Sequence, residues 1–201
     1  MNILDLRLNN EELNEVLKDD FFIEAFELAN EIGYVSCSML QKKYSISYPK
    51  ARALYEVMSL FKGVEYYQNI EDCKGIYVMR MEEDFTCEEN FDLAEKSSKR
   101  RDTSIIKFEK NEILYLGKSY NIKTRAKNHF IGIPTSTYSL KMSDEKRKNK
   151  NGRALSEFVK MYIFCLKSEY ANDAKYYEIL LPAIEDILHD KLQPIIGTPR
   201  K

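Results

Sequence analysis

The sequence predicts a mixed α+β chain of 201 residues, with helices in its first third and a small antiparallel sheet flanked by helices in the remainder. Two observations lead to this prediction. Apolar side chains recur at helical spacing through much of residues 9–60, whereas runs typical of strands occur at residues 75–79, 113–116 and 158–166. A polar stretch, 68–74, separates the two patterns. We therefore expect one domain over residues 1–70 and a second over residues 71–201.

The charge of the chain is unevenly distributed, although its net value is only −1. Residues 96–153 contain 16 Lys and Arg against 5 Asp and Glu, whereas residues 1–31 contain 2 against 9. A polyanionic partner is therefore expected to meet the basic centre of the chain and not its acidic start.

Cysteine and hydropathy patterns exclude several classes of protein. The four cysteines are scattered without a CxxC pair and the chain has two histidines, so we expect no zinc cluster. No apolar run approaches the 20 or so residues that a membrane span needs, so we expect no membrane partner. These patterns predict free thiols in a reducing cytoplasm.

The first 70 residues read as a series of helices. Helices are expected over residues 9–18 and 20–31, followed by a short one that begins near Ser36 or Ser38 and another that starts at Pro49. A tight turn joins the last two helices, and residues 63–67 follow as a short wing. This order is that of a helix-turn-helix unit.

Residues 35–48, VSCSMLQKKYSISY, together with Ala51-Arg52-Ala53, resemble the winged-helix gamma domain of FtsK-type DNA translocases. The resemblance implies that the second helix of the pair enters the major groove of DNA. The residues that would then face DNA are Lys42, Lys43, Tyr48, Lys50 and Arg52. The alternative is a packing module for protein contacts, since many winged helices never touch DNA.

The most informative stretch is residues 113–130, ILYLGKSYNIKTRAKNHF. An apolar run rich in β-formers ends at Gly117, and a helix capped by Asn121 follows, with apolar side chains every fourth residue. On that helix Arg125 and His129 share one face, one turn apart. A guanidinium and an imidazole beside a tyrosine at a strand end, Tyr115, form a plausible phosphate site, although each residue alone would suit a solvated helix face.

This stretch resembles the second half of the signature of the GIY-YIG nuclease family, through Tyr115-Leu116-Gly117, Lys118-Ser119, Asn121, Arg125 and His129. Gly75-Ile76-Tyr77 matches the first triplet, but nearly forty residues separate the two triplets, where the family has about ten. Two alternatives account for this spacing. Either Tyr77 is the first tyrosine and residues 81–110 are an insertion, or the strand at 104–108 is the first strand and Ile106 replaces the tyrosine.

The C-terminal part contains a basic segment, 141–153, which suits either a solvated loop or a contact to a phosphate backbone. Helices are expected over residues 172–181 and 182–190. In the family a proline follows the metal-binding glutamate by about nine residues. Pro194 is nine residues after Glu185, which is therefore the expected ligand, with Glu178 as the second choice. His189 is expected to face solvent or pack on the tail.

The resemblance implies a metal-dependent DNA endonuclease in which Glu185 binds Mg²⁺, or Mn²⁺, and Arg125 clamps the scissile phosphate. Tyr77 would help to activate the attacking water, while the assisting residues would be Tyr115, Lys118 and His129. Alternatives are a non-catalytic DNA-binding or regulatory protein that keeps the nuclease fold, and a nuclease directed at RNA. A homodimer that makes paired cuts is also compatible with the pattern.

Overall fold

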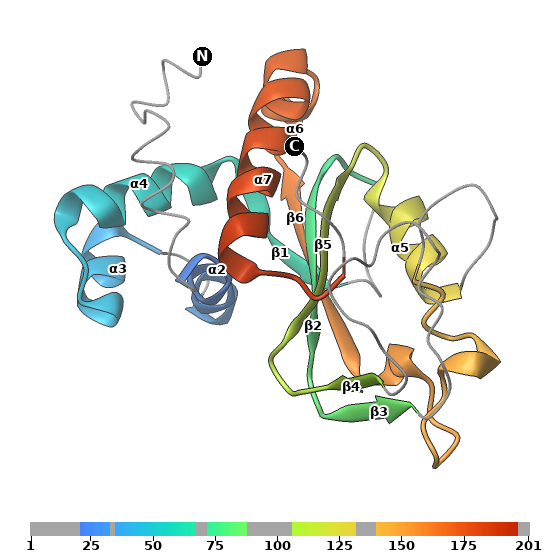
Figure 1. The fold of residues 1–201 in the computed structure, drawn as a ribbon. Coiled ribbons are helices and arrows are strands. Elements are labelled where there is room, and N and C mark those ends of the chain that lie inside the picture. Colours follow the sequence, from blue (N-terminus) through green and yellow to red (C-terminus); the bar gives the residue numbers. More distant parts are fainter. Residues whose placement is uncertain (1–20, 33–34, 67–71, 88–105, 132–139, 197–201) are drawn as a thin grey trace.

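The computed structural model describes residues 21–32, 35–66, 72–87, 106–131 and 140–196. Its centre is a four-stranded antiparallel sheet in the order β1-β6-β2-β5, with helices on both faces (Figure 1). The predicted α+β class with an antiparallel sheet is confirmed. The helix expected over residues 9–18 lies outside the described residues.

The N-terminal helices follow the predicted pattern. They are α2 (Phe21–Ile32), α3 (Cys37–Tyr44) and α4 (Tyr48–Ser59). Ser36 caps α3 by accepting a hydrogen bond from the Met39 amide, 3.3 Å away. Ser45 ends α3 in the left-handed conformation, at φ 54°, and Pro49 lies in the first turn of α4. The two helices are therefore joined by the expected short turn.

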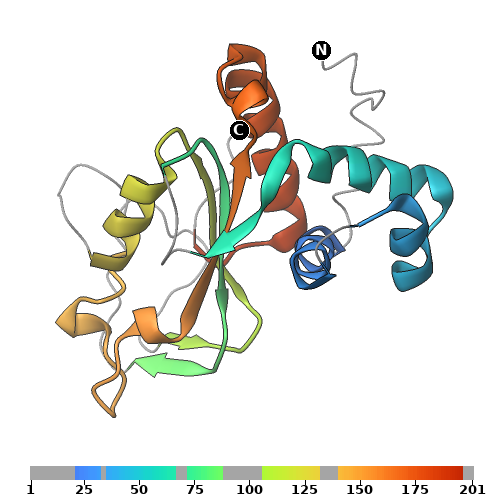
Figure 2. The same ribbon diagram turned by 180° about the vertical axis from the view of Figure 1, so that it is seen from behind.

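Strand β1 (Phe61–Tyr66) begins two residues after α4 ends and pairs with β6 (Val159–Leu166) as an edge of the central sheet (Figure 2). The prediction that residues 63–67 form a wing is therefore wrong for residues 63–66. The reason lies in packing. Phe61 lies within an aromatic cluster with Phe26 and Phe164, with ring centroids 4.9 to 6.3 Å apart, and this cluster joins the helices to the sheet.

The remaining strands are β2 (Gly75–Met81) and β5 (Ile113–Ser119) in the central sheet, and β3 (Phe85–Cys87) and β4 (Ile106–Phe108) in a separate pair. In the central sheet Tyr77 is opposite Gly117, whereas Phe108 is opposite Phe85 in the smaller pair. Residues 75–81 are thus the partner of the 113–119 strand. This pairing is the one that the first of the two spacing alternatives requires.

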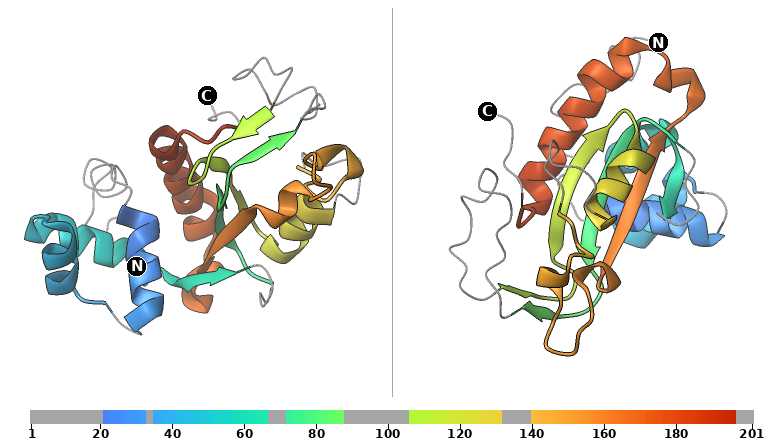
Figure 3. Two further views of the ribbon diagram at one scale, coloured as in Figure 1. Left: turned by 90° about the horizontal axis from the view of Figure 1, so that it is seen from below. Right: turned by 90° about the vertical axis from the view of Figure 1, so that its right-hand side faces the viewer.

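Helices α5 (Ile122–Ile131) and α7 (Leu181–Leu192) lie on opposite faces of the sheet (Figure 3). Alternate residues of β2 supply the two cores, whereas a register shift at Leu114 of β5 places Leu114 and Leu116 in different cores. Val78 and Leu116 pack with α2, α4 and α7, while Met79 and Leu114 pack with α5. Shorter helices complete the chain: η2 (Glu145–Arg147), η3 (Leu155–Glu157), α6 (Ser168–Ala171) and the π-helix η4 (Lys175–Leu180). Among the described helices, none is long and apolar enough to cross a membrane.

A disulfide joins Cys73, just before β2, to Cys165 in β6. The expectation of free thiols is therefore wrong for these two residues. Nothing in their spacing signalled the bond, because they are 92 residues apart and meet only when β2 pairs with β6.

Reduction of this disulfide is expected to lower the free energy of unfolding by about 2–4 kcal/mol, because the bond closes a long loop in the unfolded chain. Urea denaturation with and without a phosphine reductant measures the change. A Cys73→Ala variant should no longer respond to the reductant, whereas Cys37→Ala, which leaves the disulfide intact, should respond like the wild type. Equal stability in both conditions would contradict the prediction.

Candidate functional site

Tyr77 and Tyr115 come from neighbouring strands and point to the same face of the sheet. Tyr115 is opposite Met79, two positions from Tyr77, so the two rings lie side by side. Their centroids are 5.9 Å apart and their planes differ by 19°. Gly117, directly opposite Tyr77, makes room for this arrangement. A Cβ at that position would lie 2.7 Å from the Tyr77 hydroxyl and 3.0 Å from the Tyr115 ring.

Gly117→Ala is expected to lower the free energy of unfolding by about 1–3 kcal/mol, the usual cost of overpacking a core. Chemical denaturation measures this. The Tyr77→Phe background provides the control, because removal of the hydroxyl gives the new methyl group room. The cost of Gly117→Ala should then be smaller than in the wild type, and fully additive effects would contradict the proposed clash.

Arg125 and His129 reach Tyr77 from α5, one helical turn apart as expected. Arg125 Nε donates a hydrogen bond to the Tyr77 hydroxyl oxygen at 3.1 Å, and Nη2 is 3.5 Å from the Tyr115 hydroxyl. His129 Nε2 lies 3.0 Å from the Tyr77 hydroxyl oxygen. The helix begins where the sequence places it, because Asn121 Oδ1 accepts a hydrogen bond from the Thr124 amide at 2.8 Å. The structure thus brings four of the predicted site residues together.

The direction of the His129 hydrogen bonds follows from its surroundings. The Leu140 amide donates to Nδ1 at 3.2 Å, so that nitrogen carries no proton. Burial of the ring, with the nearby Arg125 charge, lowers the pKa of His129 to about 3, and the ring is neutral near pH 7. Its single proton therefore sits on Nε2, and His129 donates to Tyr77.

The Tyr77 hydroxyl oxygen thus accepts hydrogen bonds from both Arg125 and His129, and the side chain is 1% exposed. Burial raises the pKa of Tyr77 well above its ordinary value; Tyr115 adds to the rise and Arg125 opposes it. A hydrogen bond with Tyr115 also raises the pKa of Tyr77, as expected if the Tyr77 hydroxyl donates that bond and so keeps its proton. Tyr115 is only half-buried, so it is the tyrosine of this cluster that solvent reaches.

A second group of predicted residues lies on the α7 side of β5. Glu185 is 9% exposed, and its Oε1 accepts a hydrogen bond from the Lys118 backbone amide at 3.0 Å. The Lys118 ammonium is 3.8 Å from Oε2. Glu178, the second choice as metal ligand, is exposed on η4. Of the two glutamates, Glu185 is therefore the one whose side chain contacts β5.

His189 is buried, with 6% exposure, and its Nε2 is 3.2 Å from the Leu116 carbonyl oxygen. The expectation that it faces solvent is wrong, because α7 packs against β5 and turns this side chain toward the strand. Together with Glu185 it attaches α7 to two backbone positions of β5 that are two residues apart, 116 and 118.

Glu185 is the carboxylate that the predicted site offers to a divalent cation. Within the described ranges, no three His, Cys, Asp or Glu side chains gather around one point. Mg²⁺ often binds through one or two carboxylates, with waters and substrate phosphates as its other ligands. Glu185 fits that chemistry, and the nearby Lys118 ammonium would share the carboxylate with a bound cation.

The side chains expected to face DNA differ in exposure. Lys42, Lys43 and Tyr48 are exposed, Tyr48 at 54%. Lys50 is half-buried, and Arg52 Nε is 2.8 Å from a carboxylate oxygen of Glu56, four residues later on α4. That ion pair was not foreseen, and it lowers the net positive charge of the surface.

The basic segment 141–153 is anchored to the end of α5. Met142 N–H donates to the His129 carbonyl oxygen at 2.8 Å, and Ser143 N–H donates to the Phe130 carbonyl oxygen at 3.0 Å. Two ion pairs neutralise part of its positive charge, Lys148 with Glu145 and Arg153 with Glu157. Leu140 therefore positions the ring of His129, and the segment that follows it positions the backbone of this residue.

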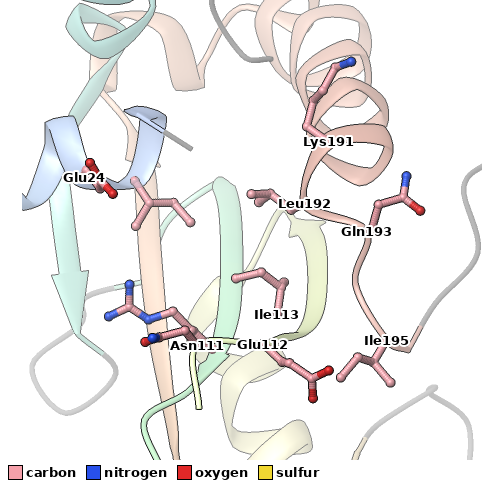
Figure 4. Close-up of a pocket in the computed structure, with 10 residues that line it drawn as sticks. Glu24, Asn111, Glu112, Ile113, Lys191, Leu192, Gln193 and Ile195 are labelled. Carbon is pink, nitrogen blue, oxygen red and sulfur yellow. The ribbon is translucent and has the colours of Figure 1, made fainter. Parts of the chain in front are cut away.

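A cavity of about 510 Å³ opens elsewhere, between the first turn of α2, the turn before β5 and the end of α7. Apolar side chains such as Ile113 and Leu192 lie at its centre, while polar groups such as Glu24 and Lys191 point away from one another (Figure 4). None of the predicted site residues lines it. Because its polar groups do not converge, it is a weaker candidate for a specific site than the tyrosine cluster.

In comparisons with known proteins, no family model, no curated protein and no solved structure matched this chain.

Proposed function

We propose that this protein is a metal-dependent DNA endonuclease that hydrolyses phosphodiester bonds. The observation that carries the proposal is the cluster of Tyr77, Tyr115, Arg125 and His129, joined by hydrogen bonds of 3.0 to 3.5 Å. It combines a guanidinium held by hydrogen bonds with a partly exposed phenol on the α5 face of β5, while the Glu185–Lys118 pair lies on the α7 side of the same strand. Such groups suit a phosphate whose negative charge grows during reaction.

Each residue has a distinct role in this proposal. Arg125 holds the scissile phosphate, while Tyr77 and His129 hold Arg125 and Tyr115 in place. Because Tyr77 is buried and protonated, we assign contact with the attacking water or a phosphate oxygen to Tyr115, in place of the water-activating role expected for Tyr77. Lys118 orients Glu185. Glu185 would hold Mg²⁺, which when bound would neutralise charge on the phosphate oxygens.

The helix pair α3 and α4 is proposed to position DNA through Lys42, Lys43 and Tyr48. Few basic side chains are exposed there, so we expect a positioning contact that contributes modest affinity. The basic segment after Leu140 is proposed to add contacts to the phosphate backbone. The winged-helix and GIY-YIG resemblances, a homodimer and a cytoplasmic location stay predictions.

Cleavage of supercoiled plasmid in Mg²⁺, with EDTA as a control, tests the proposal. Wild-type protein should nick or linearise the plasmid, whereas Glu185→Gln should cleave at least about 100-fold more slowly while still binding DNA. The Gln side chain keeps the size of Glu185 and can still accept from the Lys118 amide, so the fold should persist. Glu178→Gln serves as the matched control and should cleave normally.

A wild-type protein that binds DNA but cleaves neither DNA nor matched RNA, in Mg²⁺ or Mn²⁺, would favour the non-catalytic alternative. The raised pKa of Tyr77 favours it, and so does the finding that no three potential metal ligands gather at one point among the described residues. Cleavage of RNA alone would instead assign the same site to an RNA-directed nuclease.

A further inference from the structure

Tyr120 is a large aromatic side chain that the fold leaves exposed next to the proposed site. It is 55% exposed and follows Lys118 by two residues, in the turn between β5 and α5. Hydrogen bonds hold this turn. The Asn121 amide donates to Ser119 Oγ at 3.1 Å, and Asn121 in turn caps α5. The position of Tyr120 is thereby fixed relative to the strand end and to the helix that carries Arg125.

A second aromatic side chain supports the Tyr120 ring. The Tyr177 ring lies 5.4 Å from it, centroid to centroid, at 79°. An edge-to-face contact covers at most one face of each ring, so at least one face of Tyr120 lies outside the contact. Tyr177 is itself held by Lys74, whose ammonium is 3.9 Å from the Tyr177 ring centroid and donates to the Ala171 carbonyl oxygen at 2.8 Å.

Tyr177 lies on the π-helical turn η4. A π-helix carries an extra residue per turn, and such turns occur often at functional sites. In η4, Tyr176 and Leu180 are buried in the core, while Tyr177 is half-buried and meets Tyr120. An exposed ring in the turn between β5 and α5 is thus backed by a second ring and a cation.

We propose that Tyr120 stacks on an unpaired nucleobase, so that the preferred substrate is DNA with an unpaired nucleotide next to the cleaved bond. This inference rests on the proposed nuclease function and adds its substrate class. The face of an aromatic ring can stack on any nucleobase. The face of the base is accessible to it only where the base is not already stacked in a duplex. Lys74 adds positive charge beside the rings, which suits a phosphate backbone.

Fluorescence anisotropy in EDTA tests the inference without cleavage. The probes are a blunt duplex and the same duplex with a short single-stranded overhang that contains 2-aminopurine. Tyr120→Ala should weaken binding of the overhang DNA by roughly 5- to 100-fold, and it should abolish the change in 2-aminopurine fluorescence on binding. Tyr120→Phe should bind like the wild type. Ile131→Ala is the control, since Ile131 is 57% exposed but has no ring face.

The outcomes separate this inference from the proposed function. Equal affinity of wild type and Tyr120→Ala for the overhang DNA would overturn the inference alone, as would equal losses for both DNAs. Wild-type protein that binds neither DNA would overturn the nuclease proposal as well. Because Tyr120 is exposed, its replacement should leave the unfolding curve unchanged, and this measurement verifies that the variants are folded.

Discussion

Arg125→Ala is expected to reduce plasmid cleavage at least about 100-fold, which is the typical cost of removing one donor that stabilises charge in a transition state. Arg125 contacts the hydroxyl groups of both tyrosines, with Nε at 3.1 Å from that of Tyr77 and Nη2 at 3.5 Å from that of Tyr115. Its replacement thus removes the proposed phosphate clamp and also loosens both phenols. Initial rates of nicking measure the effect.

Two further variants define what Arg125 contributes. Arg125→Lys keeps the charge but loses the planar fork of donors, so we expect it to recover only a small part of the rate. Lys127→Ala removes an exposed charge from the same helix and should cleave nearly as fast as the wild type. Equal losses in the Lys127 and Arg125 variants would show that general positive charge matters, and would contradict a specific clamp.

Stability should fall as the pH drops below 6.5, because His129 resists protonation in the folded protein. Its pKa is lowered from 6.5 to about 3 by burial first and by Arg125 second. Between these values the unfolded chain binds a proton that the folded protein does not, so the free energy of unfolding rises with pH in this window. His129 alone should lower the free energy of unfolding by roughly 3 kcal/mol as the pH falls from 6.5 to about 4.

Chemical denaturation over this pH range, on the wild type and on His129→Asn, isolates the effect from that of the carboxyl groups. The variant lacks the titrating ring, so its stability should depend less steeply on pH, although it should be less stable at pH 7. Parallel curves for the two proteins would contradict the buried neutral imidazole. They would also remove the basis for a hydrogen bond donated from His129 to Tyr77.

The sequence predicts the centre of the site well because its signals there are local. The strand that ends at Gly117, the Asn121 cap and the spacing of Arg125 and His129 all lie within one strand-turn-helix unit. Backbone periodicity alone decides which of these side chains share a face. The register of β2 against β5 then adds Tyr77.

What the sequence did not reveal depends on contacts between distant parts of the chain. The Leu140 amide that fixes the His129 ring is a backbone group, so the identity of the residue at position 140 does not predict this contact. The burial of His189 depends on how closely α7 packs on β5. The wing predicted at residues 63–67 is instead largely part of an edge strand, because β1 pairs with β6 and Phe61 packs in the aromatic cluster.

The direct passage from α4 into β1 has a consequence for where DNA would be cut. Only Leu60 separates the helix from the strand, and its carbonyl oxygen accepts a hydrogen bond from the Lys167 amide just after β6. A tethered nuclease samples a range of positions around its anchoring contact, because its linker is flexible. Here the helix pair and the central sheet share one core, so the proposed nuclease would cut at one fixed spacing from the contact made by α3 and α4.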